Sequence, residues 1–275
     1  MSLAVVRRIP ISRPERRRVA VLSVELTLTC IALLLYFVAR GMRPPEIDES
    51  VARSLRIIHF EQQLGIFREQ AWQSAFISNG TAMWFANLVY AWAHFPVLAA
   101  IGVWLLFKDV GRFRFTRNVM LLSGIIGIVC YWALPAAPPR LMEFHGYDFG
   151  FVDTVHSATS NAYYLQPGPL VNDYAALPSF HFGWIALASA TIWVNTTRRW
   201  VRAMAVGLSL VMLWAIIVTA NHYFFDIAFG GAVVGMSWLT MAGIYSQPVR
   251  GRYVALVERV RSTFPSPQAS QPRDI

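Results

Sequence analysis

The stretch of sequence that decides the fold is Met83–Phe107, which reads MWFANLVYAWAHFPVLAAIGVWLLF. It contains no Asp, Glu, Lys or Arg, and its one histidine is His94. A helix needs about 20 apolar residues to cross the hydrocarbon core of a bilayer. This run therefore predicts a membrane-spanning helix.

Five more apolar runs are long enough, or nearly so, to span a bilayer. They are Ala20–Ala39, Asn118–Pro135, Ser179–Val194, Ala203–Asn221 and Tyr223–Tyr245. The composition agrees, since 56% of the 275 residues are hydrophobic, 14% are charged and the mean hydropathy is +0.44. Soluble domains carry about 25% charged residues, and disordered chains are poor in apolar ones. Both classes are excluded, and we expect an all-α polytopic membrane protein with six transmembrane helices.

The positive charge indicates the orientation in the membrane. The formal net charge is +9, and Lys108 is the one lysine, so arginine carries almost all of the positive charge. The arginines cluster between the apolar runs, which is typical of a topology signal rather than of a nucleic-acid-binding surface. Alternation of six spans puts every cluster on the side of the N-terminus. We expect both termini in the cytoplasm, no nucleic-acid partner and, from the high ratio of arginine to lysine, a bacterial inner membrane.

The expected domain organisation follows from these spans. Residues 1–19 form a basic cytoplasmic N-terminus, and residues 246–275 form a cytoplasmic tail that is largely disordered. The membrane catalytic domain covers residues 20–245. Within it, residues 46–80 form an outer segment with an interfacial helix. Residues 136–178 form an outer loop that is too long for a simple connector.

Four charged or titratable side chains lie near the ends of the predicted spans. They are Arg140, His181, His222 and Asp226. Such side chains are costly to place in a membrane, so they are candidates for function. The orientation above places all four on the outer side, and we expect them to converge in one pocket that faces away from the cytoplasm.

This set of side chains suits phosphoryl transfer. His222 and Asp226 are four residues apart, so a helix would place them on one face, where the carboxylate could fix the imidazole tautomer for attack. His181 could protonate a leaving oxygen and later accept a proton from an acceptor. Arg140 could hold phosphate oxygens with two donors, and Ser179 offers a hydroxyl at a helix start. Further pocket candidates are Tyr174, Asn221 and His94.

The same residues resemble the motifs of the type 2 phosphatidic acid phosphatase superfamily. Pro178-Ser179-Phe180-His181 is similar to the second motif of that family, Pro-Ser-Gly-His, and His222 with Asp226 matches the His-x-x-x-Asp end of the third. Arg140 resembles the arginine of the first motif. The resemblance covers roughly residues 50–245.

Two further segments look closest to one branch of the superfamily, the inositolphosphotransferases, which include the inositol-phosphorylceramide synthases. These segments are Tyr174–His181, which reads YAALPSFH, and His94-Phe95-Pro96 in the second predicted span. The resemblance implies six helices and catalysis without a metal or other cofactor. It also implies a phosphohistidine intermediate, with His222 as nucleophile, Asp226 as its orienter and His181 as acid and base.

The chain departs from the family pattern in its cations. The first-motif lysine is absent, and Ile216 occupies the place of the third-motif arginine, so Arg140 is the motif cation that remains. A phosphomonoester carries up to about two negative charges, whereas a phosphodiester carries one. We therefore expect a phosphodiester donor and head-group transfer. An outer arginine such as Arg68 could restore the missing charge.

Three functions stay open at this point. The favoured one transfers a phosphoinositol-type head group from a phospholipid to water or a lipid alcohol. The second hydrolyses a lipid phosphate of the phosphatidic acid or polyprenyl phosphate type, and the third is non-catalytic lipid binding or transport. A zinc site built from His181, His222 and Asp226 is disfavoured because Arg140 would repel a cation. Taken alone, His94 is more simply a packing residue.

Overall fold

A computed structural model of the chain describes residues 13–42, 46–155 and 172–246. Within these ranges the regular secondary structure is helical, and no β-strand is present apart from an isolated bridge between Ala136 and Ala175. The expectation of an all-α fold is confirmed for these ranges. The first 12 residues, nearly all of the expected cytoplasmic tail and residues 156–171 of the expected outer loop lie outside them.

The helices follow one another in an order close to the predicted one. The longer ones are α1 (Arg13–Met42), α5 (His94–Lys108), α6 (Val110–Ala133), α7 (Phe180–Asn195), α8 (Arg199–Val218) and α9 (Phe224–Tyr245). The shorter ones are α2 (Ile47–Gln63), α3 (Glu69–Phe76) and α4 (Gly80–Leu88), followed by the π-helical turn η1 (Val89–Ala93) and the 3-10 turns η2 (Pro139–Leu141) and η3 (Glu143–His145). Because α4, η1 and α5 are continuous, they form one long helical segment.

Five described helical segments are long and apolar enough to cross a membrane. They are Arg18–Met42, Gly80–Lys108, Val110–Ala133, Arg199–Val218 and Phe224–Tyr245. Each coincides with one of the six predicted spans. The remaining predicted span corresponds to α7, which has 16 residues and is shorter than a typical transmembrane helix of about 20. The count of six spans therefore stays a prediction, as does the interfacial position of α2.

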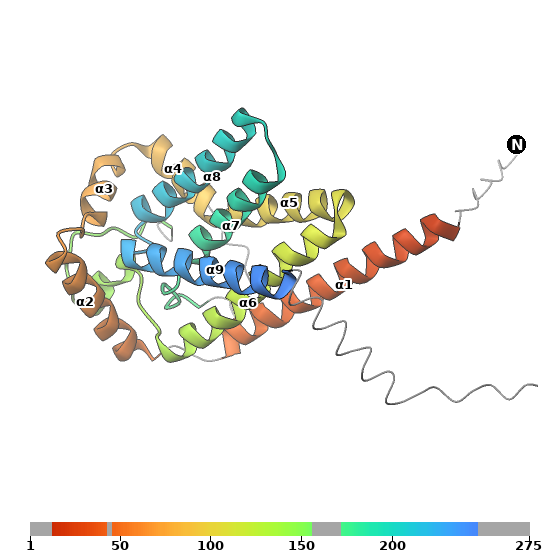
Figure 1. The fold of residues 1–275 in the computed structure, drawn as a ribbon. Helices are drawn as coiled ribbons and strands as arrows, with labels where there is room; N and C mark the ends of the chain where they lie inside the picture. Colours follow the sequence, from red (N-terminus) through yellow and green to blue (C-terminus); the bar gives the residue numbers. More distant parts are fainter. Residues whose placement is uncertain (1–12, 43–45, 156–171, 247–275) are drawn as a thin grey trace, which may run out of the picture.

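The helices form a bundle in which α9 packs on both α6 and α7, and α7 packs closely on α8. Figure 1 shows α2 and α3 at the end of the bundle away from the N-terminus, while α1 lies along α6 and extends beyond the other helices. An ionic contact ties α1 to α6, because the buried Glu25 pairs with Arg114 and Arg117 at 2.5 Å each. This cluster lies near the N-terminal end of α6. The outer loop begins at the opposite end of that helix.

Glycines let α7 and α9 approach closely where both helices begin. A Cβ atom on Gly230 of α9 would lie 2.3 Å from the carbonyl oxygen of Ser179, just before α7. A Cβ atom on Gly183 would lie 3.0 Å from the carbonyl oxygen of Gly230. The Ser179 N–H donates to the backbone carbonyl of Asp226 at 3.1 Å. The starts of the two helices that carry the motif residues are therefore fixed against each other.

Candidate functional site

A cavity of about 120 Å³ lies between the starts of α7 and α9, the end of α1, η1 and the outer loop. Its lining includes Arg140, His181 and His222, three of the four side chains that were expected to converge. Asp226 is fully buried and contacts His222 from α9. Two of the further candidates, Asn221 and His94, also line this cavity.

The ring of His222 is held through its Nδ1 atom. Nδ1 lies 2.9 Å from the carbonyl oxygen of Ala176 and 3.6 Å from Oδ2 of Asp226. The helix α9 begins at Phe224, so His222 precedes it, and Oδ2 of Asp226 accepts a hydrogen bond from the Tyr223 N–H at 3.0 Å. A carbonyl accepts only from a protonated nitrogen, so this geometry favours the Nδ1–H tautomer. The neutral ring then has its lone pair on Nε2, available for attack.

The ring of His181 lies among aromatic neighbours at the start of α7. It stacks on Tyr90 of η1 with ring centres 4.5 Å apart, and its centre is 4.4 Å from that of His94 and 5.8 Å from that of His222. Its Nε2 atom is buried and has no hydrogen-bond partner among the residues that the structure describes. Buried polar atoms are nearly always paired, so this unpaired atom, on a residue that lines the cavity, marks a candidate contact for a ligand.

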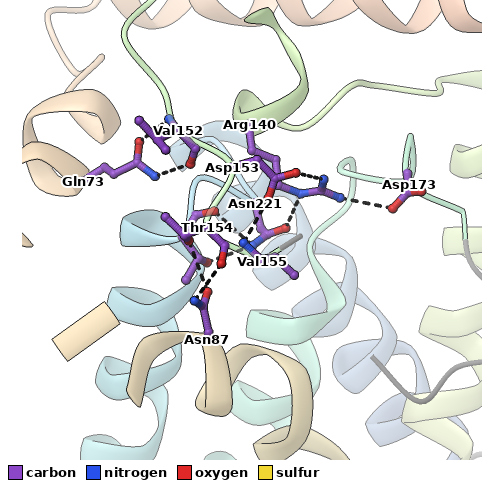
Figure 2. Close-up of polar contacts among 10 residues, drawn as sticks. Gln73, Asn87, Arg140, Val152, Asp153, Thr154, Val155, Asp173 and Asn221 are labelled. Carbon is purple, nitrogen blue, oxygen red and sulfur yellow. Dashed lines mark hydrogen bonds and ion pairs between the residues drawn. The ribbon is translucent and has the colours of Figure 1, made fainter. Parts of the chain in front are cut away.

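Arg140, in contrast, uses its donors within the protein (Figure 2). Nε donates to Oδ1 of Asn221 at 2.9 Å, Nη1 to Asp153 at 3.0 Å and Nη2 to Asp173 at 3.1 Å. Burial lowers the pKa of Arg140, but Tyr90 and the two aspartates outweigh it, and the pKa is raised above its ordinary value. The guanidinium is therefore charged, and two carboxylates already compensate that charge.

The segment that carries Asp153 is anchored on both sides. Gln73 of α3 exchanges two hydrogen bonds of 2.9 Å with the backbone of Val152, and Asn87 of α4 donates to the carbonyl of Thr154 at 3.0 Å (Figure 2). Backbone groups of a loop need such partners when they are buried. The side chain of Asp153 is thereby held in place for Arg140.

Some candidates lie outside the cavity lining. Ser179 is fully buried, but its backbone packs on Gly230, and it is not among the residues that line the cavity. The hydroxyl of Tyr174 lies 3.0 Å from Nε2 of His145, also away from the lining. Arg68, the cation considered as a replacement, directly precedes α3 and does not line the cavity either.

Sequence reasoning missed several polar residues of this site. Arg40, in the last turn of α1, lines the cavity, and its Cζ atom lies 5.8 Å from the ring centre of Tyr131. It could have been found by the criterion that identified Arg140, because it directly follows a predicted span, at the end that the predicted orientation places outside. Asp153 and Asp173 had no such signal, since acidic residues are common in outer loops.

The residues weighed as zinc ligands do not form a metal site in the described part of the chain. Within residues 13–42, 46–155 and 172–246, no group of three or more His, Cys, Asp or Glu side chains is arranged to hold a metal ion. The free thiols of Cys30 and Cys130 lie on α1 and α6.

Comparison with known proteins assigns the family. A family model described as the PAP2 superfamily matches residues 55–240, and the chain belongs to this superfamily. This match confirms the resemblance seen in the motifs around His181 and His222.

One similar protein belongs to the branch that the motifs indicated. The phosphoinositol dihydroceramide synthase of Bacteroides thetaiotaomicron is 28% identical to the chain over 173 residues, which are 56% of this chain and 54% of that protein. The chain thus matches about half the length of this relative. No solved structure matches the chain.

Proposed function

We propose that this protein is a membrane lipid phosphotransferase that moves a phosphoinositol-type head group from a phospholipid to a lipid alcohol through a phosphohistidine on His222. The observation that carries the proposal is the setting of the His222 ring, whose Nδ1 lies 2.9 Å from the Ala176 carbonyl and 3.6 Å from Asp226. An imidazole fixed in this tautomer is a nucleophile at Nε2. The name of the Bacteroides relative supports the choice of head group.

The proposed reaction has two displacement steps. Nε2 of His222 attacks the phosphorus of the donor, the bond from phosphorus to the diacylglycerol oxygen breaks, and His181 protonates that oxygen. The acceptor alcohol then loses its proton to His181 and attacks the phosphorus, and the bond to His222 breaks. Each histidine returns to its starting state, as general acid–base catalysis requires. Both rings line the same cavity, with centres 5.8 Å apart, so both can reach one phosphoryl group bound there.

The charges around the cavity support a phosphodiester donor. Arg40 and Arg140 contribute two positive charges, and Asp153 and Asp173 contribute two negative charges beside Arg140. This part of the site is therefore close to neutral. It suits the single charge of a phosphodiester better than the two charges that a phosphomonoester approaches at neutral pH.

We also propose that the cavity faces the outer side of a bacterial inner membrane, with both termini in the cytoplasm. Support comes from α6. Its basic residues Arg114 and Arg117 lie near its N-terminal end, whereas the cavity, marked by Arg140, lies beyond its C-terminal end. Basic residues favour the cytoplasmic side. A membrane-impermeant maleimide applied to intact spheroplasts should label an Asp148→Cys variant and not an Arg112→Cys variant, and the reverse result would invert the topology.

The activity is tested with purified protein in detergent. Phosphatidylinositol and phosphatidic acid are supplied separately, each with and without ceramide or diacylglycerol, and free phosphate and lipid products are measured together. His222→Ala serves as the inactive variant. His59→Ala is the matched control, because His59 lies exposed on α2 and bonds to Gln63.

Each outcome of this experiment decides between the candidate functions. A new phosphoinositol lipid without free phosphate, lost in His222→Ala and kept in His59→Ala, supports the transferase. Phosphate released from phosphatidic acid alone makes the protein a lipid phosphatase instead. The third function needs a separate test in cells: biological activity that survives in His222→Ala points to lipid binding or transport, since no phosphohistidine could then form at this position.

A further inference from the structure

Two acidic side chains of the outer segment are buried at the start of α9. Glu61 lies in the last turn of α2 and Glu69 is the first residue of α3, and neither is exposed to solvent. Carboxylates are almost never fully buried without partners, because desolvation of the charge costs several kcal/mol. We therefore expect both carboxyl groups to have specific hydrogen-bond partners in α9.

Both side chains hold the free backbone N–H groups of α9. Glu61 accepts through Oε1 from the Phe225 N–H at 2.6 Å, and Glu69 accepts through Oε1 from the Phe224 N–H at 2.8 Å. The first N–H groups of a helix have no partner within the helix, and negative charge at this end is favourable. Asp226 supplies a third carboxylate by accepting from the Tyr223 N–H. The outer segment thus fixes the helix start that directly follows His222.

The carboxyl group of Glu61 keeps its proton to a higher pH than usual. Burial, together with a hydrogen bond to Glu69 and the negative charge of Glu69, raises the pKa of Glu61 from 4.5 to about 9. Asp226 of α9 acts in the same direction, while the Phe225 N–H opposes it. The other titratable neighbour on this side is Tyr223, which precedes α9 and faces both glutamates. Oε2 of Glu61 is buried without another partner in the described chain, so a proton on it is available to Glu69.

We propose that Glu61 and Glu69 are positioning residues that share one proton and fix the start of α9, so that the ring of His222 and the carboxylate of Asp226 keep the alignment needed for attack. This inference rests on the proposed function, because it assigns the pair a role in the reaction at His222. Neither glutamate lines the cavity, so each acts through α9 and not by touching the substrate.

The two glutamates differ in the hydrogen bonds that they must satisfy. Glu61 accepts one bond from Phe225 and holds the proton, so glutamine in its place could still accept through its oxygen and donate through its amide nitrogen. Glu69 accepts from Phe224 and, through Oε2, from the Arg68 N–H at 2.9 Å, besides receiving the shared proton. Glutamine at position 69 would point its amide NH2 group at one of the donors that Glu69 now accepts from, so two donors would face each other. We therefore expect Glu61→Gln to be tolerated and Glu69→Gln to be harmful.

The experiment compares kcat, KM and the pH profile of the full-length protein with phosphatidylinositol as donor and ceramide as acceptor. At pH 7 we expect Glu61→Gln to keep kcat within about threefold of the wild type. Glu61→Ala and Glu69→Gln should lower kcat about tenfold or more at nearly unchanged KM, because misplacement of a nucleophile penalises the chemical step. The matched control is Glu49→Gln, an exposed glutamate of α2, which should leave both constants unchanged.

The pH profile separates positioning from simple structural support. Wild-type kcat should fall as the pH rises through about 9, where the pair loses its proton, and Glu61→Gln should lack this fall because an amide does not ionise. Superimposable profiles, or a Glu61→Gln variant as slow as Glu61→Ala, would overturn the proposal. If Glu69→Gln does not fold, the pH profile of Glu61→Gln still tests whether the two glutamates share a proton.

A second measurement does not depend on activity. An acid whose pKa is raised by folding stabilises the protein below its ordinary pKa, and this stability is lost as the pH rises through the folded value. The thermal midpoint of the wild type should therefore fall between about pH 5 and 9 relative to that of Glu61→Gln. A wild type that is inactive on every lipid but shows this difference rejects the proposed function and keeps the proton-sharing pair. An active wild type without the difference rejects the pair alone.

Discussion

The two sides of the cavity differ in how far the protein satisfies the hydrogen bonds of their polar atoms. On the histidine side, formed by His94, His181 and His222, the Nε2 atom of His181 has no hydrogen-bond partner in the described chain. On the arginine side, formed by Arg140, Asp153, Asp173 and Asn221, the three ends of the guanidinium all donate to protein oxygens. One side is ready for a ligand, and the other is already satisfied by the protein.

This difference indicates that one side contacts the ligand and the other stabilises the loop. An unpaired buried polar atom costs free energy until a ligand pairs it, whereas a satisfied network stabilises the loop that it joins. A change at His181 should therefore affect the rate and leave stability nearly unchanged. Changes on the arginine side should affect both, because Arg140 connects the outer loop to the turn before His222.

The largest effect is expected for His181→Ala. Loss of a general acid and base typically costs about 10²–10⁴-fold in rate, and no other histidine shares its contact with both His94 and His222 among the described residues. Turnover should fall by about that factor while the thermal midpoint in detergent stays close to that of the wild type. His145→Ala is the matched control, since His145 contacts Tyr174 outside the cavity lining. Equal losses in both variants would remove the distinction between the two sides.

The next largest effect is expected for Arg140→Ala, and it should appear in stability. The side chain of Arg140 is 5% exposed and that of Asp153 is 11% exposed, so removing the arginine leaves a nearly buried carboxylate without its cation. Breaking a buried ion pair in this way costs about 3–5 kcal/mol of unfolding free energy. Denaturation in detergent should show a lowered midpoint together with reduced turnover. Arg112→Ala, which breaks an exposed pair with Asp109, should change the midpoint little.

A retained midpoint in Arg140→Ala would contradict this interpretation of the arginine side. If turnover were lost at unchanged stability, Arg140 would belong functionally with the histidines, as a phosphate-holding group that releases its carboxylates when substrate binds. The two readouts together therefore assign the residue to one side of the cavity or the other.

A smaller effect, on stability as well as on rate, is expected for Gly230→Ala. The added methyl group would meet the carbonyl oxygen of Ser179 at 2.3 Å and force α9 away from the start of α7. Overpacking of this kind costs about 1–3 kcal/mol. We expect a lower thermal midpoint and a reduced rate, because the helix starts next to His181 and His222 separate. In Gly235→Ala nothing lies within 4 Å of the new methyl group, so stability should be unchanged or slightly higher.

The parts of this molecule that sequence could predict are those set by local pattern. Apolar runs determined five helical segments long enough to span, and the motif residues His181 and His222 do line one cavity. Spacing could not determine which way a side chain at a helix start would face. Ser179, which belongs to the same motif as His181, packs its backbone on Gly230 and lies outside the cavity lining.

The parts that sequence could not predict depend on contacts between distant segments. Glu61 and Glu69 precede their partners in α9 by more than 150 residues, and in the sequence they look like ordinary charges of an amphipathic outer helix. The carbonyl of Ala176 that holds His222 is a backbone atom, which no residue pattern reveals. The fold brings these groups together only once the outer segment and the loop pack on α9.

The smallest effect is expected for Asp173→Asn, and it tests the charge of the arginine side. Asp173 pairs with Nη2 of Arg140 at 3.1 Å, but its side chain is 47% exposed, so the pair should contribute less than about 1 kcal/mol to stability. Its loss leaves one donor of Arg140 less engaged and makes the site one unit more positive. Turnover of phosphatidic acid relative to phosphatidylinositol should then rise about threefold, because the added charge favours a more negative phosphate. Asp148→Asn, an exposed loop carboxylate that bonds to the Gly150 N–H, should leave the ratio unchanged. If Asp173→Asn also leaves it unchanged, the aspartates do not set the preference for a phosphodiester, and the head-group choice must come from the wall formed by Arg40 and the histidines.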